Sequence, residues 1–355
     1  MTKQTRTLVG LAAALVVCGG AYGGLRLWNE QQEQVDDATY VLQLSQVTGV
    51  SFTNSYGTYS FTKTEDTWRW DEDEAFPADQ DALEELAEQV GTLTAVRVIQ
   101  DPEDLSAYGL DAPALQTSVT GGDGQSATLL LGTVADDYCY AKLGDSDTIY
   151  TIATDLPEQL QELELLDLAA IPEFPSLGTD NITSLTWESG ETALTLTKTE
   201  AEESTDTSAD SSEEAEPTWD VNGAPIPADN STFTSLMAQV SSLALDACYD
   251  YQGLEDTLSA CGLDTPVGVL TVTYGEGESL TLTLGALDGT GEAYYVQLSG
   301  DPAVYQMSAD SVSTLVSLTA DALTAVEEDD EETAEEAAET EASSNESANK
   351  KSIGK

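Results

Sequence analysis

Hydrophobic and polar residues alternate in short runs along residues 40–170, and turns rich in Gly, Asn, Asp and Ser separate the runs. Such alternation is typical of strands that bury one face. The pattern predicts an opening hairpin, a short third strand at Trp68–Trp70, and later a meander of four strands. The longer predicted strands cover residues 47–52, 58–63, 96–99, 116–120, 127–131, 138–143 and 148–152.

Two stretches of this region have helical spacing instead. The first begins after Pro77 and Asp79 and ends at Gly91, a common stop signal. The second covers residues 156–168 and ends before Pro172. The glutamates of the first stretch lie off its apolar stripe, so the stripe is interpreted as core: Leu83, Leu86, Ala87 and Val90.

The same order of elements returns in residues 171–326. Tyr108–Pro113 reads YGLDAP and reappears as CGLDTP at Cys261–Pro266, an offset of 261 − 108 = 153, and Leu129–Gly132 reappears at Leu282–Gly285 with the same offset. The predicted elements of this second copy are strands at 182–187, 193–199, 219–221, 269–274, 279–284, 293–298 and 303–307, and helices at 233–240 and 311–323.

These elements predict an α+β fold with two tandem duplicated modules. Each module is an antiparallel β-sheet or meander with one or two helices packed on one face. The first module covers residues 40–170 and the second 171–326. An acidic insert at 200–216 lengthens a hairpin loop of the second module, and an acidic tail covers 327–355. Their Ser, Thr, Glu and Asp content is typical of disorder.

The N-terminus changes the picture of where the modules sit. Residues 7–25 carry no charge and follow Lys3 and Arg6. As a helix, 19 residues rise about 28 Å, close to the thickness of a bilayer core. We therefore expect residues 1–28 to be a cytoplasmic tip and a single transmembrane helix, and 29–39 a stalk. A signal peptide cleaved near Gly19–Ala21 and a lipoprotein signal at Cys18 are alternatives. All three place residues 29–355 outside the cytoplasm, and the transmembrane helix also holds the protein on the cell membrane.

Charge restricts the partners. The chain has 66 acidic and 11 basic residues, a net charge of −55, and the modules stay acidic when the insert and the tail are set aside. Such a surface repels phosphate backbones, which excludes nucleic acids. A solubilising surface is the favoured interpretation of this charge. Weak, diffuse binding of divalent cations and a saline habitat are alternatives.

Several catalytic chemistries lack their residues. The chain contains no histidine, which removes Ser-His-Asp catalysis, Cys-His catalysis and histidine zinc sites. It contains no Cys-x-x-Cys, no Walker loop and no strand-linked Gly-x-Gly-x-x-Gly. No catalytic, cofactor-binding or metal-binding residue is assigned, and we expect no cofactor and no enzymatic activity.

Carboxylate clusters are the first feature that could still carry chemistry. Asp71–Glu74 is a run of four acidic residues, and Asp288–Glu292 surrounds two glycines. Either could bind calcium, and paired carboxylates could cleave a glycoside. Neither has the EF-hand spacing, and chance clusters are expected in so acidic a chain. Both are interpreted as turns.

Aromatic residues and cysteines give two further hypotheses. The aromatic side chains could stack on a sugar or a peptide, but their alternation favours core packing or cross-strand pairing. Cys248 and Cys261 lie 13 positions apart and could form a disulfide, with buried free thiols as the favoured alternative, together with Cys139. The aromatic candidates are Trp68, Trp70, Tyr138, Tyr140, Tyr294 and Tyr295.

The doubled Gly-Leu-Asp-x-Pro element is interpreted as a structural corner. Gly109 and Gly262 fit a backbone conformation that other residues resist, and Asp111 and Asp264 could cap the following turn. Pro113 and Pro266 would stiffen the entry to the next strand.

The same residues carry a family resemblance. Tyr108–Pro113, Leu129–Gly132, Tyr140 and Ile149–Tyr150 resemble the family called domain of unknown function 4340, and the second copy matches through Gly262–Pro266, Leu284–Gly285, Tyr294–Tyr295 and Val304–Tyr305. Cys261 departs from the usual aromatic residue. The resemblance covers about residues 40–320 and implies bacterial envelope proteins without an established reaction. Many are encoded beside ABC-type exporters related to gliding-motility systems.

The favoured function is therefore that of a membrane-anchored, extracytoplasmic, non-catalytic protein, an accessory or interaction component of an ABC-type transport system in the cell envelope. The alternative is an extracytoplasmic ligand-binding module that holds a glycan, a peptide or a divalent cation between its two halves. A carboxylate-based hydrolase is a third hypothesis, which the residue inventory favours least.

Overall fold

The computed structural model describes residues 38–200 and 217–326, except 101, 103 and 136. The predicted transmembrane segment, most of the stalk, the insert beyond Glu200 and the acidic tail lie outside these residues. Within the described part, no helix has both the length and the apolar character needed to cross a membrane.

The chain divides into two compact units. Among the described residues, the first contains 38–75 and 80–164, and the second contains 76–79, 165–200 and 217–326. The short segment 76–79 joins the second unit because it pairs with the chain near Ala169: the amide of Asp79 donates to the Leu168 carbonyl at 2.8 Å, and Ala78 and Ala169 form an antiparallel bridge.

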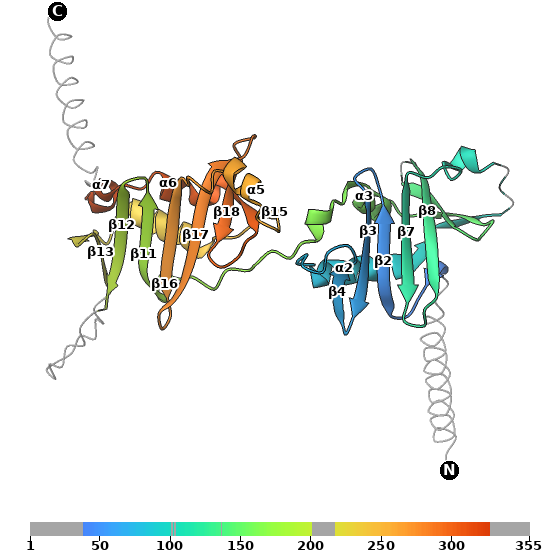
Figure 1. Ribbon diagram of the computed structural model, residues 1–355, viewed down its shortest axis with the longest axis horizontal. Helices are drawn as coiled ribbons and strands as arrows, with labels where there is room; N and C mark the ends of the chain where they lie inside the picture. The colour runs from blue at the N-terminus through green and yellow to red at the C-terminus, as the bar shows by residue number, and fades with distance from the viewer. Residues whose placement is uncertain (1–37, 101, 103, 136, 201–216, 327–355) are drawn as a thin grey trace, which may run out of the picture. The chain divides into compact units, whose positions relative to one another are not determined.

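The first unit is built on an eight-stranded antiparallel sheet with the order β4-β3-β2-β7-β8-β9-β10-β6 (Figure 1). A separate two-stranded sheet pairs β1 with β5. The strands of the first unit are β1 (Thr39–Gln43), β2 (Val47–Thr53), β3 (Thr58–Thr64), β4 (Thr67–Trp70), β5 (Thr92–Ala95), β6 (Arg97–Ile99), β7 (Leu115–Gly121), β8 (Ser126–Ala135), β9 (Tyr138–Leu143) and β10 (Ile149–Ile152). The helices of this unit are α2 (Gln80–Gly91), η1 (Leu105–Tyr108) and α3 (Asp155–Glu162).

The second unit is built on a nine-stranded antiparallel sheet with the order β14-β13-β12-β11-β16-β17-β18-β19-β15. Its strands are β11 (Ile182–Ser189), β12 (Thr192–Thr199), β13 (Thr218–Val221), β14 (Ala224–Pro225), β15 (Ala247–Asp250), β16 (Gly268–Tyr274), β17 (Glu278–Leu287), β18 (Ala293–Leu298) and β19 (Val304–Ser308), and its helices are η2 (Leu165–Leu168), α4 (Ser231–Ser241), α5 (Glu255–Ala260), η3 (Ala309–Val312), α6 (Ser313–Val316) and α7 (Ala320–Thr324).

The two sheets repeat one topology. Apart from the extra edge strand β14, the strands of the second sheet follow the order of the first one for one. The strand pairs of both sheets are antiparallel, and a few helices accompany each sheet. The predictions of an α+β fold and of a tandem duplication are confirmed.

One face of each sheet is buried under helices. The stripe on α2 is fully buried and packs against β2 and β7, and in Figure 1 this helix lies behind the strands of the first unit. In the second unit α4 buries Leu236, Met237 and Val240. Buried and exposed side chains alternate along each strand as a result. In β12, Leu194 and Leu196 are buried, whereas Thr195 and Thr197 are exposed.

One strand was not predicted and two predicted helices are wrong in detail. The strand predicted at 96–99 is present as β6, but a further strand, β5, precedes it; β5 pairs with β1 and β6 pairs with β10. The helix predicted at 156–168 ends at Glu162, because Leu163 is extended, and resumes as η2. The helix predicted at 311–323 is divided into η3, α6 and α7, since Thr319 leaves the helical conformation to cap α7.

Candidate functional site

On the face opposite the helices, each sheet carries a row of hydroxyl side chains across four neighbouring strands. Register pairing aligns one Ser or Thr on each of β3, β2, β7 and β8, and likewise on β12, β11, β16 and β17. We call these the hydroxyl rows. The first contains Ser60, Ser51, Ser118 and Thr128, and the second contains Thr195, Thr186, Thr271 and Thr281.

The two hydroxyl rows share a hydrogen bond as well as a position. Ser118 Oγ and Thr128 Oγ1 lie 2.8 Å apart, and the equivalent Thr271 Oγ1 and Thr281 Oγ1 lie 3.2 Å apart. Neighbouring strands are about 4.8 Å apart, so each row forms a flat, uncharged strip. The rows are not among the sequence predictions, which concern the buried residues of each alternating strand. The polar residues between them, here Ser and Thr, carry the pattern that forms the rows.

The two carboxylate clusters form turns. Asp73 accepts a hydrogen bond from the amide of Ala75 at 2.9 Å. Asp288 Oδ1 accepts from the amides of Gly291 and Glu292 at 2.7 and 3.1 Å, and Thr290 donates to the same carboxylate. The Thr290 hydroxyl, followed by these amides, lowers the pKa of Asp288. In each cluster one carboxylate, Asp73 or Asp288, accepts hydrogen bonds within the turn, and the described residues contain no group of three or more potential metal ligands.

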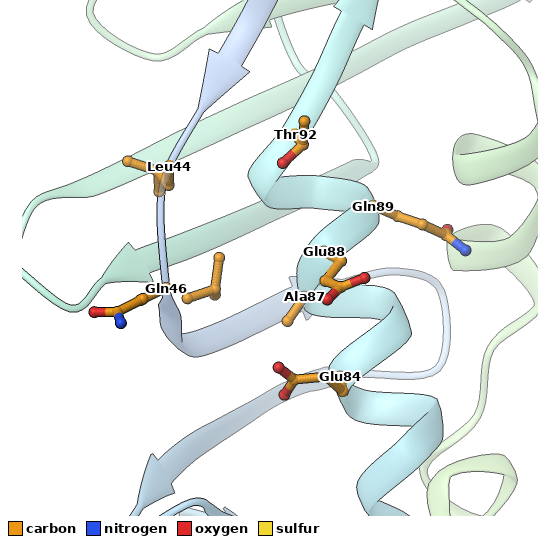
Figure 2. A pocket seen from close by; sticks show the side chains of 8 residues that line it. Leu44, Gln46, Glu84, Ala87, Glu88, Gln89 and Thr92 are labelled. Atoms are coloured by element: carbon orange, nitrogen blue, oxygen red, sulfur yellow. The ribbon is translucent and has the colours of Figure 1, made fainter.

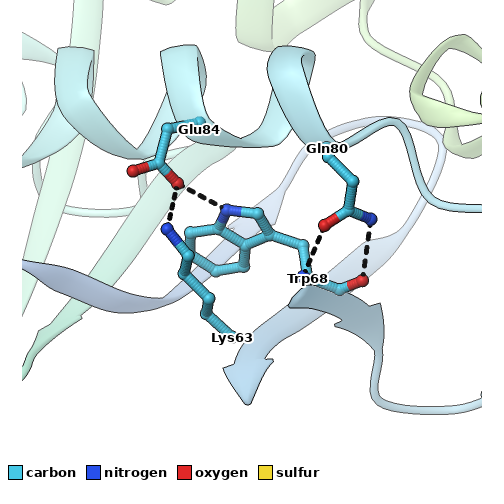
Figure 3. Close-up of polar contacts among 4 residues, drawn as sticks. All are labelled: Lys63, Trp68, Gln80 and Glu84. Carbon is cyan, nitrogen blue, oxygen red and sulfur yellow. Dashed lines mark hydrogen bonds and ion pairs between the residues drawn. The ribbon is translucent and has the colours of Figure 1, made fainter. Parts of the chain in front are cut away.

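Trp68 belongs to a network that joins the β3–β4 hairpin to α2 (Figure 3). Its buried indole donates through Nε1 to Glu84 Oε2 at 2.8 Å, and the Lys63 ammonium lies 2.7 Å from the same oxygen. Gln80 completes the network, because its side-chain amide accepts from the Trp68 amide and donates to the Trp68 carbonyl. One carboxylate thus accepts hydrogen bonds from both an ammonium group and an indole N–H.

This network predicts a pH-dependent loss of stability. The hydrogen bond from Lys63, followed by that from Trp68, lowers the pKa of Glu84 below its ordinary 4.5. The folded pKa is below the unfolded one, so the stabilisation is present above pH 4.5 and lost as the pH falls through the lowered pKa. We expect Glu84→Gln to destabilise the first unit by about 0.5 kcal/mol at pH 7, since solvent screens the pair.

Urea denaturation, monitored by hydrogen exchange at pH 7 and at pH 3, checks this result. The difference between wild type and Glu84→Gln should shrink at pH 3. Glu85→Gln is the matched control, because Glu85 only accepts an exposed bond from Gln89, and it should show no such pH dependence. An equal cost for Glu84→Gln at both pH values would contradict the role of the ionised carboxylate.

A cavity of about 530 Å³ lies beside the same helix, between α2 and the segment that leads into β2 (Figure 2). Glu84 and Glu88 line it from α2, and Leu44 and Gln46 from the opposite side. The carboxylate of Glu84 is held ionised by Lys63, so it has no proton to donate as a general acid. Glu84 therefore does not fit the role of the acid in a glycosidase.

The second unit has a cavity of about 420 Å³ on the helix-covered side of its sheet. Its walls include Trp219, Phe233, Ile226 and Pro227, and its charged lining residues are Lys198 and Asp180. The Trp219 and Phe233 rings are 5.4 Å apart. This cavity thus combines an aromatic wall with a cationic residue.

The other aromatic candidates pack against one another. Tyr140 contacts both Tyr108 and Tyr138, with ring centroids 5.0 and 5.3 Å apart. In the second unit Tyr295 contacts Tyr249 at 4.6 Å, and burial, together with the hydrogen bond to Tyr249, raises the pKa of Tyr295 to about 12. Tyr294, like Trp70, is partly buried in its strand. These positions agree with cross-strand and corner packing.

The Gly-Leu-Asp-x-Pro element forms the same corner in both units. Gly109 and Gly262 have φ of 70° and 68°, and each ends a helical turn with the backbone hydrogen bonds of a Schellman motif. The carbonyl before each glycine packs against a second glycine, Gly132 or Gly285, where a Cβ would overlap it. Asp264 accepts from the hydroxyls of Ser259 and Thr265, not from a backbone amide.

Three cysteines lie within the described residues, and all three are free and buried. Burial raises the pKa of the Cys139 and Cys248 thiols to about 11, and that of Cys261 also rises. A thiol with so high a pKa is protonated at neutral pH and is a poor nucleophile. Cys248 and Cys261 are not joined in a disulfide in this structure.

Comparison with known proteins gives one family. The model described as Domain of unknown function (DUF4340) matches residues 68–220 and again residues 219–324. The chain belongs to this family. The two matched segments begin at Trp68 and at Trp219, which occupy equivalent places in the two units, so the family unit is present twice. No curated protein and no solved structure matches the DUF4340 chain.

Proposed function

We propose that the protein is a membrane-anchored, extracytoplasmic, non-catalytic component of an envelope transport system of the ABC type. Its N-terminal segment would be the transmembrane helix, and its two units would bind transporter subunits through their hydroxyl rows. The carrying observation is that a chain of net charge −55 keeps the same uncharged row on both sheets.

Charge explains why such a row suits a partner. Carboxylates placed opposite each other on neighbouring strands would repel, so the fold alone favours neutral residues there. The same neutrality makes the rows the part of each sheet that another protein can approach without desolvating carboxylates. Hydroxyls can both donate and accept hydrogen bonds, which suits a polar protein surface.

The chemistry of the ionisable side chains supports a role in binding another protein and not in catalysis. A carboxylic acid that donates protons near neutral pH needs a raised pKa, as in glycosidases. Where the surroundings shift Glu84, Asp104 and Asp288, they lower the pKa. The buried thiols are likewise held in their unreactive form.

Site-specific photocrosslinking in living cells tests this proposal. A benzophenone amino acid replaces Thr195, which is exposed on the second hydroxyl row, or Ser235, which is exposed on α4, as the matched control. We expect Thr195 to give an adduct with an ABC transporter subunit in the membrane fraction, at least fivefold above Ser235. Equal adducts at both positions, or none at Thr195, would argue against the rows as the binding surface.

Ligand binding is a second candidate function, and the cavity beside Lys198 favours it. The sequence predicts a glycan, a peptide or a divalent cation as the ligand. The cavity combines apolar and aromatic walls with Lys198 and Asp180, and its lysine favours a ligand with a negative group.

A further inference from the structure

The two units place a lysine and a tryptophan in the same relation. Across the β3–β4 pair Lys63 is the register partner of Trp68, and across the β12–β13 pair Lys198 is the register partner of Trp219. The helix that follows is also equivalent, since Leu86 and Val90 of α2 match Leu236 and Val240 of α4. The two sites can therefore be compared position by position.

The first unit supplies its own carboxylate. Glu84 Oε2 accepts from both the Lys63 ammonium and the Trp68 indole, at 2.7 and 2.8 Å. The ammonium also lies 5.7 Å from the centroid of the indole ring. A single helix residue thus neutralises the cation and satisfies the indole N–H.

The second unit lacks this carboxylate. Thr234 stands at the position of Glu84, and α4 contains no acidic residue, although the chain has 66. The hydroxyl of Thr234 donates to the Asn230 carbonyl at 3.1 Å, so it is used within the helix. Among the described residues, none accepts a hydrogen bond from the indole N–H of Trp219.

Lys198 is nevertheless the more deeply buried lysine. Its side chain is 6 % exposed, against 20 % for Lys63. Its ammonium donates to the Asp180 carbonyl at 2.9 Å and pairs at 3.2 Å with Glu200, whose side chain is 76 % exposed. An ion pair with so exposed a carboxylate is weak, so a ligand carboxylate can replace Glu200 at the ammonium.

We propose that the cavity beside Lys198 binds a monocarboxylate with an aromatic or aliphatic body. Its carboxylate would take the place that Glu84 holds in the first unit, between the Lys198 ammonium and the Trp219 indole. Its apolar body would pack in the cavity on Trp219, Phe233 and Ile226. This inference rests on the second candidate function, ligand binding, and names the chemical class of ligand.

The acidic residues near the cavity favour a ligand with a single negative group. Asp180 and Glu200 lie at the site, and they would repel a ligand with further carboxylates or phosphates. A monocarboxylate meets one ammonium with one charge, and the apolar walls supply the rest of the binding free energy.

Tryptophan indole signals of the ¹⁵N-labelled full-length chain in detergent test the site directly. The probe is N-acetyl-L-phenylalanine, and its uncharged amide is the matched control ligand. We expect the acid to shift the Trp219 indole signal saturably and to leave the Trp68 signal in place, because Glu84 already occupies that donor. The amide should bind at least tenfold more weakly.

A second probe, 3-phenylpropanoate, distinguishes the kinds of carboxylate ligand. Saturable binding of either acid supports the proposal. Tighter binding of N-acetyl-L-phenylalanine than of 3-phenylpropanoate favours a peptide C-terminus as the ligand.

Two variants make the assignment specific. Thr234→Glu installs the carboxylate of the first unit, so it should shift the Trp219 signal without ligand and weaken probe binding at least tenfold. Lys198→Met keeps the aliphatic stem and should weaken binding to the same extent, whereas Lys63→Met should leave binding unchanged. Equal binding of acid and amide, or a Thr234→Glu variant that binds like wild type, overturns the proposal. If glycan or calcium instead shifts second-unit signals, ligand binding survives and the carboxylate assignment fails.

Discussion

Replacing Gly285 with alanine is expected to destabilise the second unit by about 2 kcal/mol, within the range for overpacked sites. An added Cβ at this position would overlap the carbonyl oxygen of Cys261 and press on Leu263. The carbonyl cannot move away freely, because the Ala286 amide donates to it at 2.7 Å. The helical turn that contains this carbonyl ends at Gly262, and the left-handed conformation of Gly262, with a φ of 68°, sets the direction of the backbone at the corner.

The same substitution in the first unit should have the same effect. A Cβ at Gly132 would overlap the Tyr108 carbonyl and contact Leu110. Gly289→Ala and Gly144→Ala are the controls, since an added Cβ meets no atom within 4 Å at Gly289 and nothing closer than 3.7 Å at Gly144. Hydrogen-exchange mass spectrometry of the full-length chain reports the stability of each unit separately. Glycine substitutions that cost the same at all four positions would show that the corner is not close-packed.

This corner explains why the doubled motif could be found without a structure. The αL glycine, the leucine that follows it and the glycine opposite are each fixed by backbone geometry and not by a ligand. Residues constrained in this way tolerate few alternatives, so they stay recognisable in both copies. The interpretation as a structural corner agrees with the geometry at Gly109 and Gly262.

Strand positions were predictable for a different reason. A sheet that buries one face forces alternation, and Leu194–Thr197 shows it residue by residue. The extra break between β5 and β6 was not predictable, because it depends on which distant strands accept each half: β1 for the first and β10 for the second. Such choices are made by tertiary pairing and leave no periodic signal.

The site at Lys198 could not be read from the sequence. Lys63 and Trp68 are 5 positions apart, but Lys198 and Trp219 are 21 apart because the insert separates them, and only strand register shows that they are equivalent. The absence of acidic residues from α4 was visible in the sequence. It became informative only when Thr234 was matched to Glu84.

Replacing Asn230 with alanine is expected to destabilise the second unit by about 3 kcal/mol, because several buried polar groups lose their partners at once. Asn230 is 2 % exposed and caps α4, where its Oδ1 accepts from the Phe233 amide at 2.8 Å. Its Nδ2 donates to the carbonyls of Ala322 and Ala325 at 2.9 and 3.0 Å, which ties the start of α4 to the end of α7. In the first unit a buried asparagine makes a similar tie from a different place: Asn54, in the turn between β2 and β3, donates to the Leu160 and Leu163 carbonyls at the end of α3.

A single cap is the appropriate comparison for this prediction. Thr319 caps α7 by accepting from the Ala322 amide at 3.2 Å in an exposed position, so Thr319→Ala should cost about 1 kcal/mol or less. Asn230→Asp should remain as destabilising as Asn230→Ala at pH 7, because a carboxylate keeps the cap but faces two carbonyls without a proton to donate. Hydrogen exchange of the α4 and α7 peptides measures all three variants. If Asn230→Ala costs no more than Thr319→Ala, the buried amide only caps its own helix, and the two helices are held together by their apolar contacts alone.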